Sequence, residues 1–431
     1  MIFSPDKARE LLTRVIAMRE EGELSLLLCA ERSLGTRFNG CAISQNILKF
    51  NATLRLTARV GQRRASLTVN ALSDDDVLRR AVRQAHHLAL RNPEDEEVME
   101  EPGEVFSGPE RARSESAEAL EIPAIGSFVA EACALGSVAG VDLAGLVMVT
   151  KGLKAYADSR GGLAAERYHR TDTHITASGK KGSGWAEHQD HTLTRDNVVD
   201  CARRAIEKGL AAQNPRELAP RPMTAVLEPQ AVGDLLTSSI WDWDQRAKDE
   251  GRSAFVGAPE ELGKLSLVSD PAHPAFPTLS FNEDGERYSR SVWLDKGRVQ
   301  QLMTPRFWAK KQGIPFKPFP SNLVLEGEGH SLDEMIRSTE DGVLVTRFWY
   351  IRSVDPTTLT YTGMTRDGLF RIENGKVTGP LVDYRFNDSL FRVLRNVSMS
   401  GKPVPTGEYL DAAMPALKVE GFRFTSLSGG L

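Results

Sequence analysis

The sequence predicts an α+β protein in which antiparallel strands dominate, and three observations support this class. In the first half of the chain, helical patterns alternate with runs in which apolar and polar residues take turns. In the second half, after one helical pattern at about 230–246, most of the chain is typical of strand and turn. Tight turns join several of the strands, as at Asn374-Gly375, a strong short-range hairpin signal.

Size and composition narrow the functional classes. A chain of 431 residues is long enough for two or three domains, and 41% apolar with 26% charged residues is typical of a soluble globular protein. A net charge of -4 argues against nucleic acid as a direct ligand. The polar N-terminus lacks a signal-peptide core, and no apolar run approaches the roughly 18 residues that span a membrane. Four cysteines without a CxxC pair indicate a reduced, cytoplasmic protein.

The N-terminal elements follow in order. Pro5-Asp6 opens a helix, strands are expected at 24–30, 43–47, 53–60 and 65–71, and a turn is expected around Gly35–Gly40. Ser73 is the expected cap of the next helix, with acidic residues in its first turn. The pattern of helix, strands and helix then repeats: a helix at 124–135, strands at 141–149, 152–157 and 163–177, and a helix at 195–211. This repetition indicates a weak internal duplication.

Two composition shifts suggest the domain organisation. The stretch 92–116 is rich in Glu, Pro and Gly, which predicts a mobile linker or surface loop rather than packed structure. Pro215, Pro220 and Pro222 mark a boundary, so we expect an N-terminal α+β region over 1–218 and a C-terminal β-rich domain over 219–431.

Known catalytic motifs are missing from the sequence. There is no GxSxG, no P-loop, no GxGxxG after a strand and no HExxH helix. His188 and His191 could converge on a metal with Asp190, but a solvated loop explains this segment better. Glu283 and Asp284 lie in what is first of all a hairpin turn.

The stretch 343–381 predicts a meander of long antiparallel strands. Arginine and aromatic residues alternate along it, so its surface could hold an extended peptide or could be an ordinary half-exposed sheet. The side chains that would contact such a peptide are Arg347, Trp349, Arg352, Tyr361 and Arg371.

Several segments, in their order and spacing, resemble the TldD/PmbA family, once described as modulators of DNA gyrase and now as zinc-dependent peptidases. They are TRFNGCAISQN, AYADSRGG, the run from Asp270 to Met303, SNLVLEGEGHSLDEMI, the stretch 342–381 and PALKVEGFRF. The resemblance covers nearly the whole chain. It implies an α+β N-terminal region and a C-terminal domain of long, curved antiparallel β-sheets. It also implies dimers, in which a zinc-bearing TldD-type subunit pairs with a PmbA/TldE-type partner and cleaves extended peptides.

The sequence departs from the family at the zinc motif. Zinc-bearing members carry HExxxH, and in the matching segment AVLEPQAVGDLLTSSIWDWD these positions are Thr237, Ser238 and Asp242. The family's third ligand is a cysteine near the C-terminus, and this chain has no cysteine after Cys201. Zinc catalysis needs about three protein ligands and a base. We therefore expect no metal or cofactor in this chain and no peptidase activity from it alone.

Three interpretations follow. The leading one is a non-catalytic PmbA/TldE-type subunit that forms a heterodimer with a zinc-bearing TldD-type homologue, which alone would hold zinc, and acts on unfolded or precursor peptides. The second is a stand-alone, homodimeric peptide-binding protein without protease activity. The third is a metallopeptidase with a displaced site, built from His188 and His191 with Glu283 or Asp284.

Overall fold

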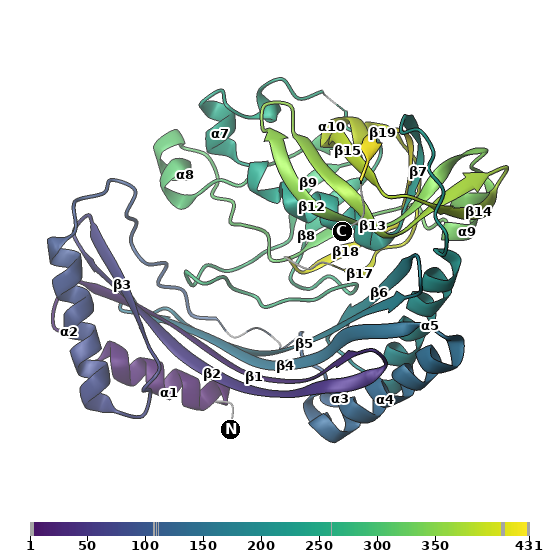
Figure 1. Cartoon of the computed structure of the whole chain (residues 1–431). Helices are drawn as coiled ribbons and strands as arrows, with labels where there is room; N and C mark the ends of the chain where they lie inside the picture. Colours follow the sequence, from purple (N-terminus) through teal and green to yellow (C-terminus); the bar gives the residue numbers. More distant parts are fainter. Residues whose placement is uncertain are drawn as a thin grey trace.

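The structure, a computed structural model, describes residues 4–106, 108, 110, 112–259, 261–406 and 410–428. Figure 1 shows two layers: a long, curved sheet formed by the N-terminal half, and the C-terminal half seated on its concave side. The predicted α+β class is confirmed, with antiparallel strands dominating both halves.

The N-terminal half repeats one pattern of elements. The first copy contains α1 (Pro5–Ile16), β1 (Glu23–Asn39), β2 (Ala42–Val60), β3 (Arg63–Val69) and α2 (Asp75–Arg91). After α3 (Glu115–Ala119), the second contains α4 (Ile122–Ala139), β4 (Asp142–Asp158), β5 (Leu163–Ser178), β6 (Ser183–Asp190) and α5 (Arg195–Ala211). The strands form one six-stranded sheet in the order β3-β2-β1-β4-β5-β6, with β1 and β4 antiparallel at its centre. This arrangement is the one that a duplication predicts.

Glycines inside the strands explain why two predicted breaks are absent. The turn expected around Gly35–Gly40 begins only after Asn39, and β4 runs straight through the break expected near 150. A Cβ on Gly35 would lie 3.0 Å from the Val147 carbonyl oxygen, and one on Gly152 would overlap the Tyr168 ring. Both glycines therefore allow close packing within a strand instead of marking a turn.

The N-terminal cap of α2 also differs from the prediction. Asp74, not Ser73, caps α2: its carboxylate accepts hydrogen bonds from the backbone N–H groups of Asp76 (2.9 Å) and Val77 (3.0 Å). A carboxylate at this position also favours the positive end of the helix dipole.

Part of the stretch 92–116 packs against the sheet, which its composition does not predict, whereas residues 92–97 are exposed as expected of a surface loop. Glu101 is buried and accepts hydrogen bonds from Ser25 and Tyr156, both 3.0 Å long. Val105 bridges to Leu163 at the start of β5. Its acidic side chains thus find partners on the sheet, which composition alone does not reveal. Ser107, Pro109 and Arg111 of this stretch lie outside the described residues.

Among the described residues, one helix, α4, is long and apolar enough to cross a membrane by length and composition. The sequence predicted no stretch of this kind. Ile125, Val129, Ala132 and Cys133 form a buried stripe on it that packs into the core beneath the sheet. The apolar sequence of α4 thus fits a helix that covers a sheet.

The C-terminal half contains two sheets. The first joins β8 (Ser266–Ser269), β9 (Ser291–Asp295), β10 (Arg298–Val299), β11 (Leu323–Glu326), β17 (Val404–Thr406) and β18 (Ala412–Met414). The second joins β7 (Pro222–Leu227), β12 (Asp341–Asp355), β13 (Thr360–Glu373), β14 (Lys376–Leu381), β15 (Tyr384–Ser389), β16 (Val397–Ser400) and β19 (Leu417–Leu427).

Five strands of the second sheet follow one another in the order β12-β7-β19-β15-β13. The first and last of these, β12 and β13, also pair with each other, so the sheet closes into a ring. Two of its neighbours, β12 and β7, run parallel, as do β11 and β18 in the first sheet. The predicted meander over 343–381 is confirmed as β12, β13 and β14, with left-handed backbone at Asn374 (φ 50°) and Gly375 (φ 73°). Closure leaves fewer unpaired strand edges than an open sheet would.

The helices of the C-terminal half are α6 (Pro229–Ser239), α7 (Gln245–Asp249), α8 (Arg306–Gln312), α9 (Leu332–Arg337) and α10 (Leu390–Arg395), with 3-10 turns η1 (Ile240–Asp242) and η2 (Ala254–Val256). The single helix expected over 230–246 is therefore split. The split follows from Asp244, whose carboxylate caps α7, and from Trp243, which is buried in the core between the two helices.

Candidate functional site

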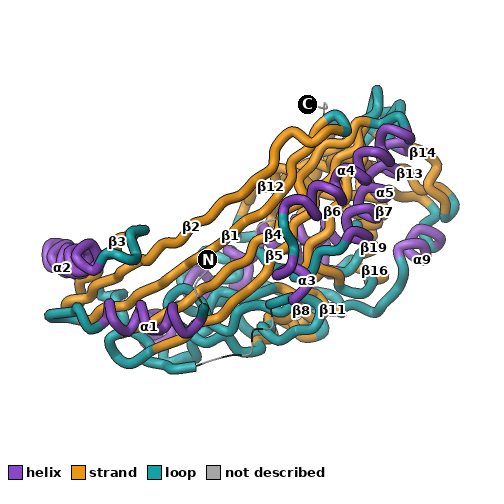
Figure 2. The backbone as a smooth tube through the Cα atoms, turned by 90° about the horizontal axis from the view of Figure 1, so that it is seen from below, coloured by secondary structure: helices purple, strands orange, loops and turns teal. Residues whose placement is uncertain are grey.

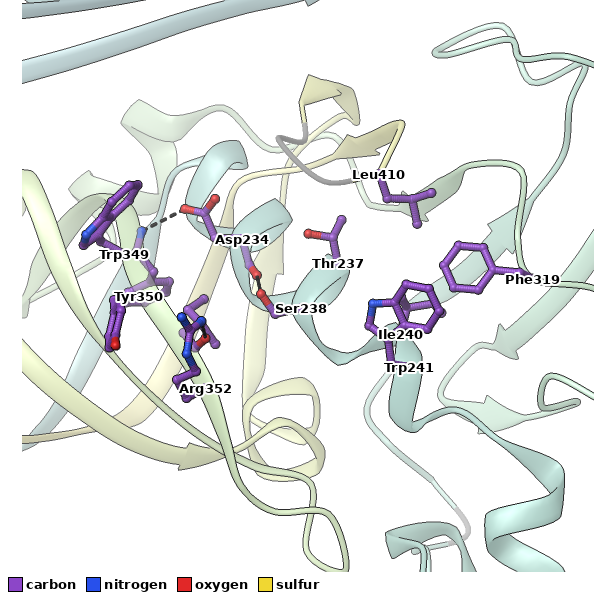
Figure 3. Close-up of a pocket in the computed structure, with 12 residues that line it drawn as sticks. Asp234, Thr237, Ser238, Ile240, Trp241, Phe319, Trp349, Tyr350, Arg352 and Leu410 are labelled. Carbon is purple, nitrogen blue, oxygen red and sulfur yellow. Dashed lines mark hydrogen bonds between the residues drawn. The ribbon is translucent and has the colours of Figure 1, made fainter. Parts of the chain in front are cut away.

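A cavity of about 680 Å³ lies between α6 and β12, and Figure 3 shows its walls. On one side stand Trp349 and Tyr350 of β12, and on the other Trp241, Phe319 and Leu410. The remaining lining residues are Asp234, Thr237, Ser238, Ile240, Phe348, Ile351 and Arg352. The cavity is therefore walled by aromatic side chains and floored by one helix.

The polar residues of α6 hold the helix and its neighbouring strand in place. The Asp234 carboxylate accepts hydrogen bonds from the Phe348 backbone N–H (2.9 Å) and from the Gln230 amide (2.7 Å). The Thr237 hydroxyl donates to the Gly233 carbonyl (2.7 Å), and the Ser238 hydroxyl donates to the Asp234 carbonyl (2.6 Å). Neither hydroxyl is activated by an adjacent base, because each is bonded to its own helix backbone.

Asp242, the third of the positions that we aligned with a zinc motif, is also engaged. It lies in the 3-10 turn after α6 and accepts a hydrogen bond from the Tyr361 hydroxyl. Burial and this bond raise the pKa of the Tyr361 hydroxyl. Of these three residues only Asp242 has a carboxylate, and that carboxylate already accepts a hydrogen bond from Tyr361. Among the described residues, no group of three His, Cys, Asp or Glu side chains could hold a metal ion.

The aromatic wall depends on an irregularity in β12. The register between β12 and β13 shifts between Trp349 and Arg352, and Tyr350 takes a left-handed conformation with φ 56°. For an aromatic residue this conformation is rare and costs about 1 kcal/mol or more, so the surrounding structure must hold it. The bulge leaves Tyr350 59% exposed at the cavity.

Arg352 brings a positive charge to the cavity. Its guanidinium lies 4.3 Å from the centre of the Tyr350 ring and donates to the Ile351 carbonyl. Within the described part of the chain, no carboxylate forms an ion pair with Arg352. Arg347 and Arg371, by contrast, pair with Asp367 and Asp341. Arg352 is therefore available to an acidic ligand.

The structure divides the five predicted peptide contacts. Trp349 and Arg352 line the cavity, whereas Tyr361 lies behind it, bonded to Asp242. Arg347 faces the N-terminal half, where its guanidinium stacks 4.5 Å from the Trp185 ring. Arg371 lies near the other end of β13, beside Asp341. The alternation of arginine and aromatic residues identified the strand but not which side chains share a site.

Several lining residues were not predicted. Asp234, Trp241, Phe319 and Leu410 come from three separate segments, and no local pattern connects them. Tyr350 lies in the predicted strand but, by alternation, was expected on the opposite face from Trp349. The only sequence signal was the density of aromatic residues around 348–350.

The cavity lies along an unpaired strand edge. β7 pairs with β12 only over Gly342–Val345, so in the described chain no strand pairs with this side of β12 beyond Val345. The Phe348 N–H is taken by Asp234, but the following residues border the cavity. An exposed edge of this kind can accept an extended chain through backbone hydrogen bonds.

A buried polar network lies beneath the cavity and joins the two halves. The Thr406 hydroxyl contacts Glu187 of β6 (2.8 Å) and the Gln230 side-chain oxygen, and Gln230 in turn donates to Asp234. Burial and the neighbouring Asp234 carboxylate raise the pKa of Glu187 to about 8. The network therefore holds two carboxyl groups that cannot both be charged without repulsion.

The displaced metal site is not assembled. Both ring nitrogens of His191 lie 2.7 Å from backbone carbonyl oxygens, those of His169 and Pro277. Glu283 pairs with Arg55 and Lys154, and Asp284 with Arg64. His188 lies within β6, not in the solvated loop that we expected, because 183–190 completes the sheet. The structure does not bring His188, His191, Glu283 and Asp284 together, so this interpretation is wrong.

Sequence comparisons agree with this architecture. Residues 220–426 match the family of the PmbA/TldA metallopeptidase C-terminal domain. A protein named metalloprotease from Methanothermobacter thermautotrophicus is 22% identical over 254 residues, which cover 50% of this chain and 54% of that protein. Another, from Archaeoglobus fulgidus, is 23% identical over 150 residues, covering 31% and 34%. The chain thus matches about half or less of the length of these relatives.

Solved structures share the fold over nearly the whole chain. TldE from Thermococcus kodakarensis superposes with a TM-score of 0.84 at 17% identity, covering 98% of this chain and 100% of that one. A protein described as a modulator of DNA gyrase from Bacteroides thetaiotaomicron gives 0.81 at 19% identity, covering 98% and 99%. One from Thermotoga maritima gives 0.81 at 15%, covering 96% and 99%.

Proposed function

Because the chain belongs to the TldD/PmbA family, we propose that it is a peptide-binding subunit that does not itself cut. The family is metallopeptidase-like, and relatives of this chain are named metalloproteases. In our proposal this chain holds an extended, unfolded or precursor peptide in the cytoplasm, and a zinc-bearing TldD-type homologue supplies the cleavage.

The observation that carries the proposal is the pairing of an aromatic cavity with an unreactive helix. Thr237 and Ser238 are bonded to the α6 backbone and Asp242 to Tyr361, so the helix offers neither a metal ligand set nor a base. Activation of water by zinc needs both. The chemistry that remains at this site is binding.

The geometry of β12 supports a peptide as the bound ligand. A peptide strand placed along the free edge beyond Phe348 would gain backbone hydrogen bonds, while its side chains would meet Trp349 and Tyr350 or Trp241 and Phe319. Aromatic side chains give large contact area for little loss of conformational entropy. Backbone pairing is independent of sequence, which suits a subunit that receives unfolded chains.

Binding is tested with fluorescein-labelled nonapeptides that contain either a central Phe or a central Ala. We expect the Phe peptide to bind about tenfold more tightly, and Trp349→Ala to remove most of this difference. Val404→Ala, at an exposed apolar residue of β17 outside the cavity, is the matched control. Equal affinity of wild type and Trp349→Ala for the Phe peptide would contradict the proposal.

The non-catalytic role is tested by mixing. The purified chain is incubated with a labelled unfolded peptide alone, with a zinc-bearing homologue from the same genome, and with both. We expect cleavage only when the homologue is present and a rate at least tenfold higher when both are present. Zinc that co-purifies one-to-one with this chain, or full activity of the homologue without it, would show that the assignment is wrong.

A further inference from the structure

A second cavity, of about 390 Å³, lies at the seam between the N-terminal and C-terminal halves. The N-terminal half contributes the turn before β6 and the end of α5, and the C-terminal half contributes the middle of β13 and the end of β14. Figure 1 shows β6 and α5 below β14, and β13 contacts both β6 and α5. Within the described chain, this seam cavity shares no lining residue with the cavity between α6 and β12. It is therefore a separate candidate site.

Apolar side chains form much of the wall of the seam cavity. Leu369 of β13 and Leu381 of β14 are paired neighbours and both are buried. Ala212 and Pro215, which follow α5, line the cavity from the N-terminal half. Pockets for small molecules measure roughly 300–1,000 Å³ and are mostly apolar with a few polar groups. The seam cavity lies at the small end of this range and suits a small, partly apolar molecule.

One of its two aspartates has its charge balanced within the chain. The Asp367 carboxylate accepts hydrogen bonds from the Ser183 hydroxyl (2.8 Å) and from the Arg347 guanidinium (3.0 Å). Arg366 lies 3.5 Å from the same carboxylate. Because Ser183 belongs to β6 and Asp367 to β13, their hydrogen bond joins the two halves beside the cavity. Asp367 thus frames the cavity and occupies both arginines.

The other aspartate, Asp383, is only partly satisfied. Its Oδ1 accepts a hydrogen bond from the Thr365 hydroxyl (2.8 Å), whereas in the described chain no donor reaches Oδ2 and no basic side chain forms an ion pair with it. Burial raises the pKa of Asp383 to about 6, the Asp367 carboxylate adds to the rise, and Arg366 and Arg347 oppose it. At neutral pH the carboxyl group is still mainly ionised. A protonated amine at Oδ2 would compensate this charge.

A lysine lines the cavity from the other half. Lys181 lies in the turn between β5 and β6, is exposed, and forms no ion pair among the described residues. Its backbone N–H donates to the Gln213 side-chain oxygen (3.1 Å), which holds the turn against the end of α5. The cavity therefore has a negative group on its C-terminal wall, a positive group on its N-terminal wall and apolar side chains around them. This arrangement complements a molecule that carries both charges.

We propose that the seam cavity binds a small zwitterion with an apolar side chain, either a free amino acid or a dipeptide. The ammonium group of the ligand donates to Asp383 Oδ2, and its carboxylate meets the Lys181 ammonium. Its side chain packs against Leu369 and Leu381. The proposal does not rest on the proposed function, because the two cavities are lined by different residues.

The test is calorimetric titration of the full chain at pH 7.5 with leucine and with the dipeptide Ala-Leu, which distinguishes the two sources of the zwitterion. Acetylation of the amino group of the tighter ligand should weaken binding at least tenfold, and amidation of its carboxylate two- to fivefold. Asp383→Asn, which keeps an acceptor for Thr365, should reproduce the first loss, and Lys181→Met the second. Asp295→Asn on β9 and Lys180→Met, at exposed residues outside the cavity, are the matched controls.

The pH dependence of binding provides a readout that a merely structural role of Asp383 would not give. Wild-type affinity should fall about tenfold from pH 7.5 to pH 5, because Asp383 takes up a proton near pH 6 and then no longer attracts an ammonium group. The affinity of Asp383→Asn should stay constant over this range.

Three results would overturn the proposal: no binding of either ligand at millimolar concentration, equal binding of the acetylated ligand, or loss of binding in Trp241→Ala, which alters only the cavity between α6 and β12. Binding of leucine or Ala-Leu by a chain that does not bind the Phe nonapeptide would support the seam site and count against the proposed function alone.

Discussion

In the described chain, two long stretches of strand edge that lack a partner strand differ in almost every property. The β12 edge beyond Val345 is bulged, held in a rare conformation at Tyr350, and bordered by aromatic rings and by Arg352. The β2 edge over 42–53 pairs with β1 without a bulge at these residues and carries one charge, Lys49. The first edge opens into a cavity, whereas the second lies on the outer rim of the sheet (Figures 2 and 3).

What lies beneath each edge differs as well. Behind the β12 edge is the buried polar network of Glu187 and Asp234, whose charge depends on pH. The β2 edge adjoins leucines such as Leu34 and Leu54 in the two helix-covered cores. Polar, bulged and pH-sensitive surroundings suit a ligand that is bound and released, and an apolar edge suits a lasting contact. Four substitutions test this contrast, from the largest expected effect to the smallest.

Glu187→Gln should have the largest effect, and it should depend on pH. Because the pKa of Glu187 is raised from 4.5 to about 8 in the folded chain, folding takes up a proton between these values. The stability linked to Glu187 is fully present below pH 4.5 and is lost as pH rises to 8. Gln stays neutral at every pH. The free energy of unfolding of the variant should therefore rise relative to wild type over this range, by at most about 5 kcal/mol at pH 8.

The measurement is urea unfolding at pH 5, 6.5 and 8. The groups that face Glu187 are Asp234 of α6, His174 of β5, Arg204 of α5 and Arg347 of β12. Glu217→Gln, at an exposed glutamate, is the control and should parallel the wild type at all three values. Identical pH profiles for Glu187→Gln and wild type would mean that the buried network does not make the surroundings of the β12 edge sensitive to pH.

Asp234→Ala should come second. It leaves the buried Phe348 N–H without an acceptor, which costs about 1–3 kcal/mol of unfolding free energy. Since this bond holds β12 to α6 at the cavity, affinity for the Phe peptide should fall about tenfold. Asp295→Ala, at an exposed aspartate of β9, is the control. Unchanged affinity of Asp234→Ala for the Phe peptide would mean that this bond does not shape the cavity.

Arg352→Met should have a smaller and more selective effect. Exposed charge pairs contribute up to about 1 kcal/mol, so affinity should fall two- to fivefold for a Phe nonapeptide that ends in a free carboxylate. The same peptide with an amide end should bind both forms equally. Arg385→Met, at an exposed arginine of β15, should change neither affinity. An equal loss for both peptides would mean that Arg352 acts through packing against Tyr350 instead of charge.

The sequence predicted the elements better than the site. Periodicity located α1, α5 and the meander of β12, β13 and β14, because burial of one face leaves a local signature. The predicted breaks near Gly35 and Gly152 are absent, because these glycines allow close packing inside a strand instead of marking a turn. Closure of the β12-β7-β19-β15-β13 ring could not be predicted, since it depends on pairing between segments far apart in the chain.

The cavity shows the same limit at the level of side chains. Strict alternation would place Trp349 and Tyr350 on opposite faces, and only the bulge brings both to one cavity. Trp241 and Phe319 join them from distant segments. The unreactive α6 was the more predictable feature, since it depends on the residue types at Thr237, Ser238 and Asp242, which are read directly from the sequence.

Lys49→Gln should have the smallest effect, and for that reason it sharpens the contrast. Lys49 is exposed on the β2 edge, so its charge contributes little to the folded state. Removing that charge should change the free energy of unfolding by less than about 0.5 kcal/mol, because exposed charges are screened by solvent and salt. Urea unfolding at 50 mM and 500 mM NaCl provides the measurement. A change of more than about 1 kcal/mol that disappears in 500 mM NaCl would indicate an electrostatic contact of Lys49. The β2 edge would then resemble the β12 edge more than it differs from it.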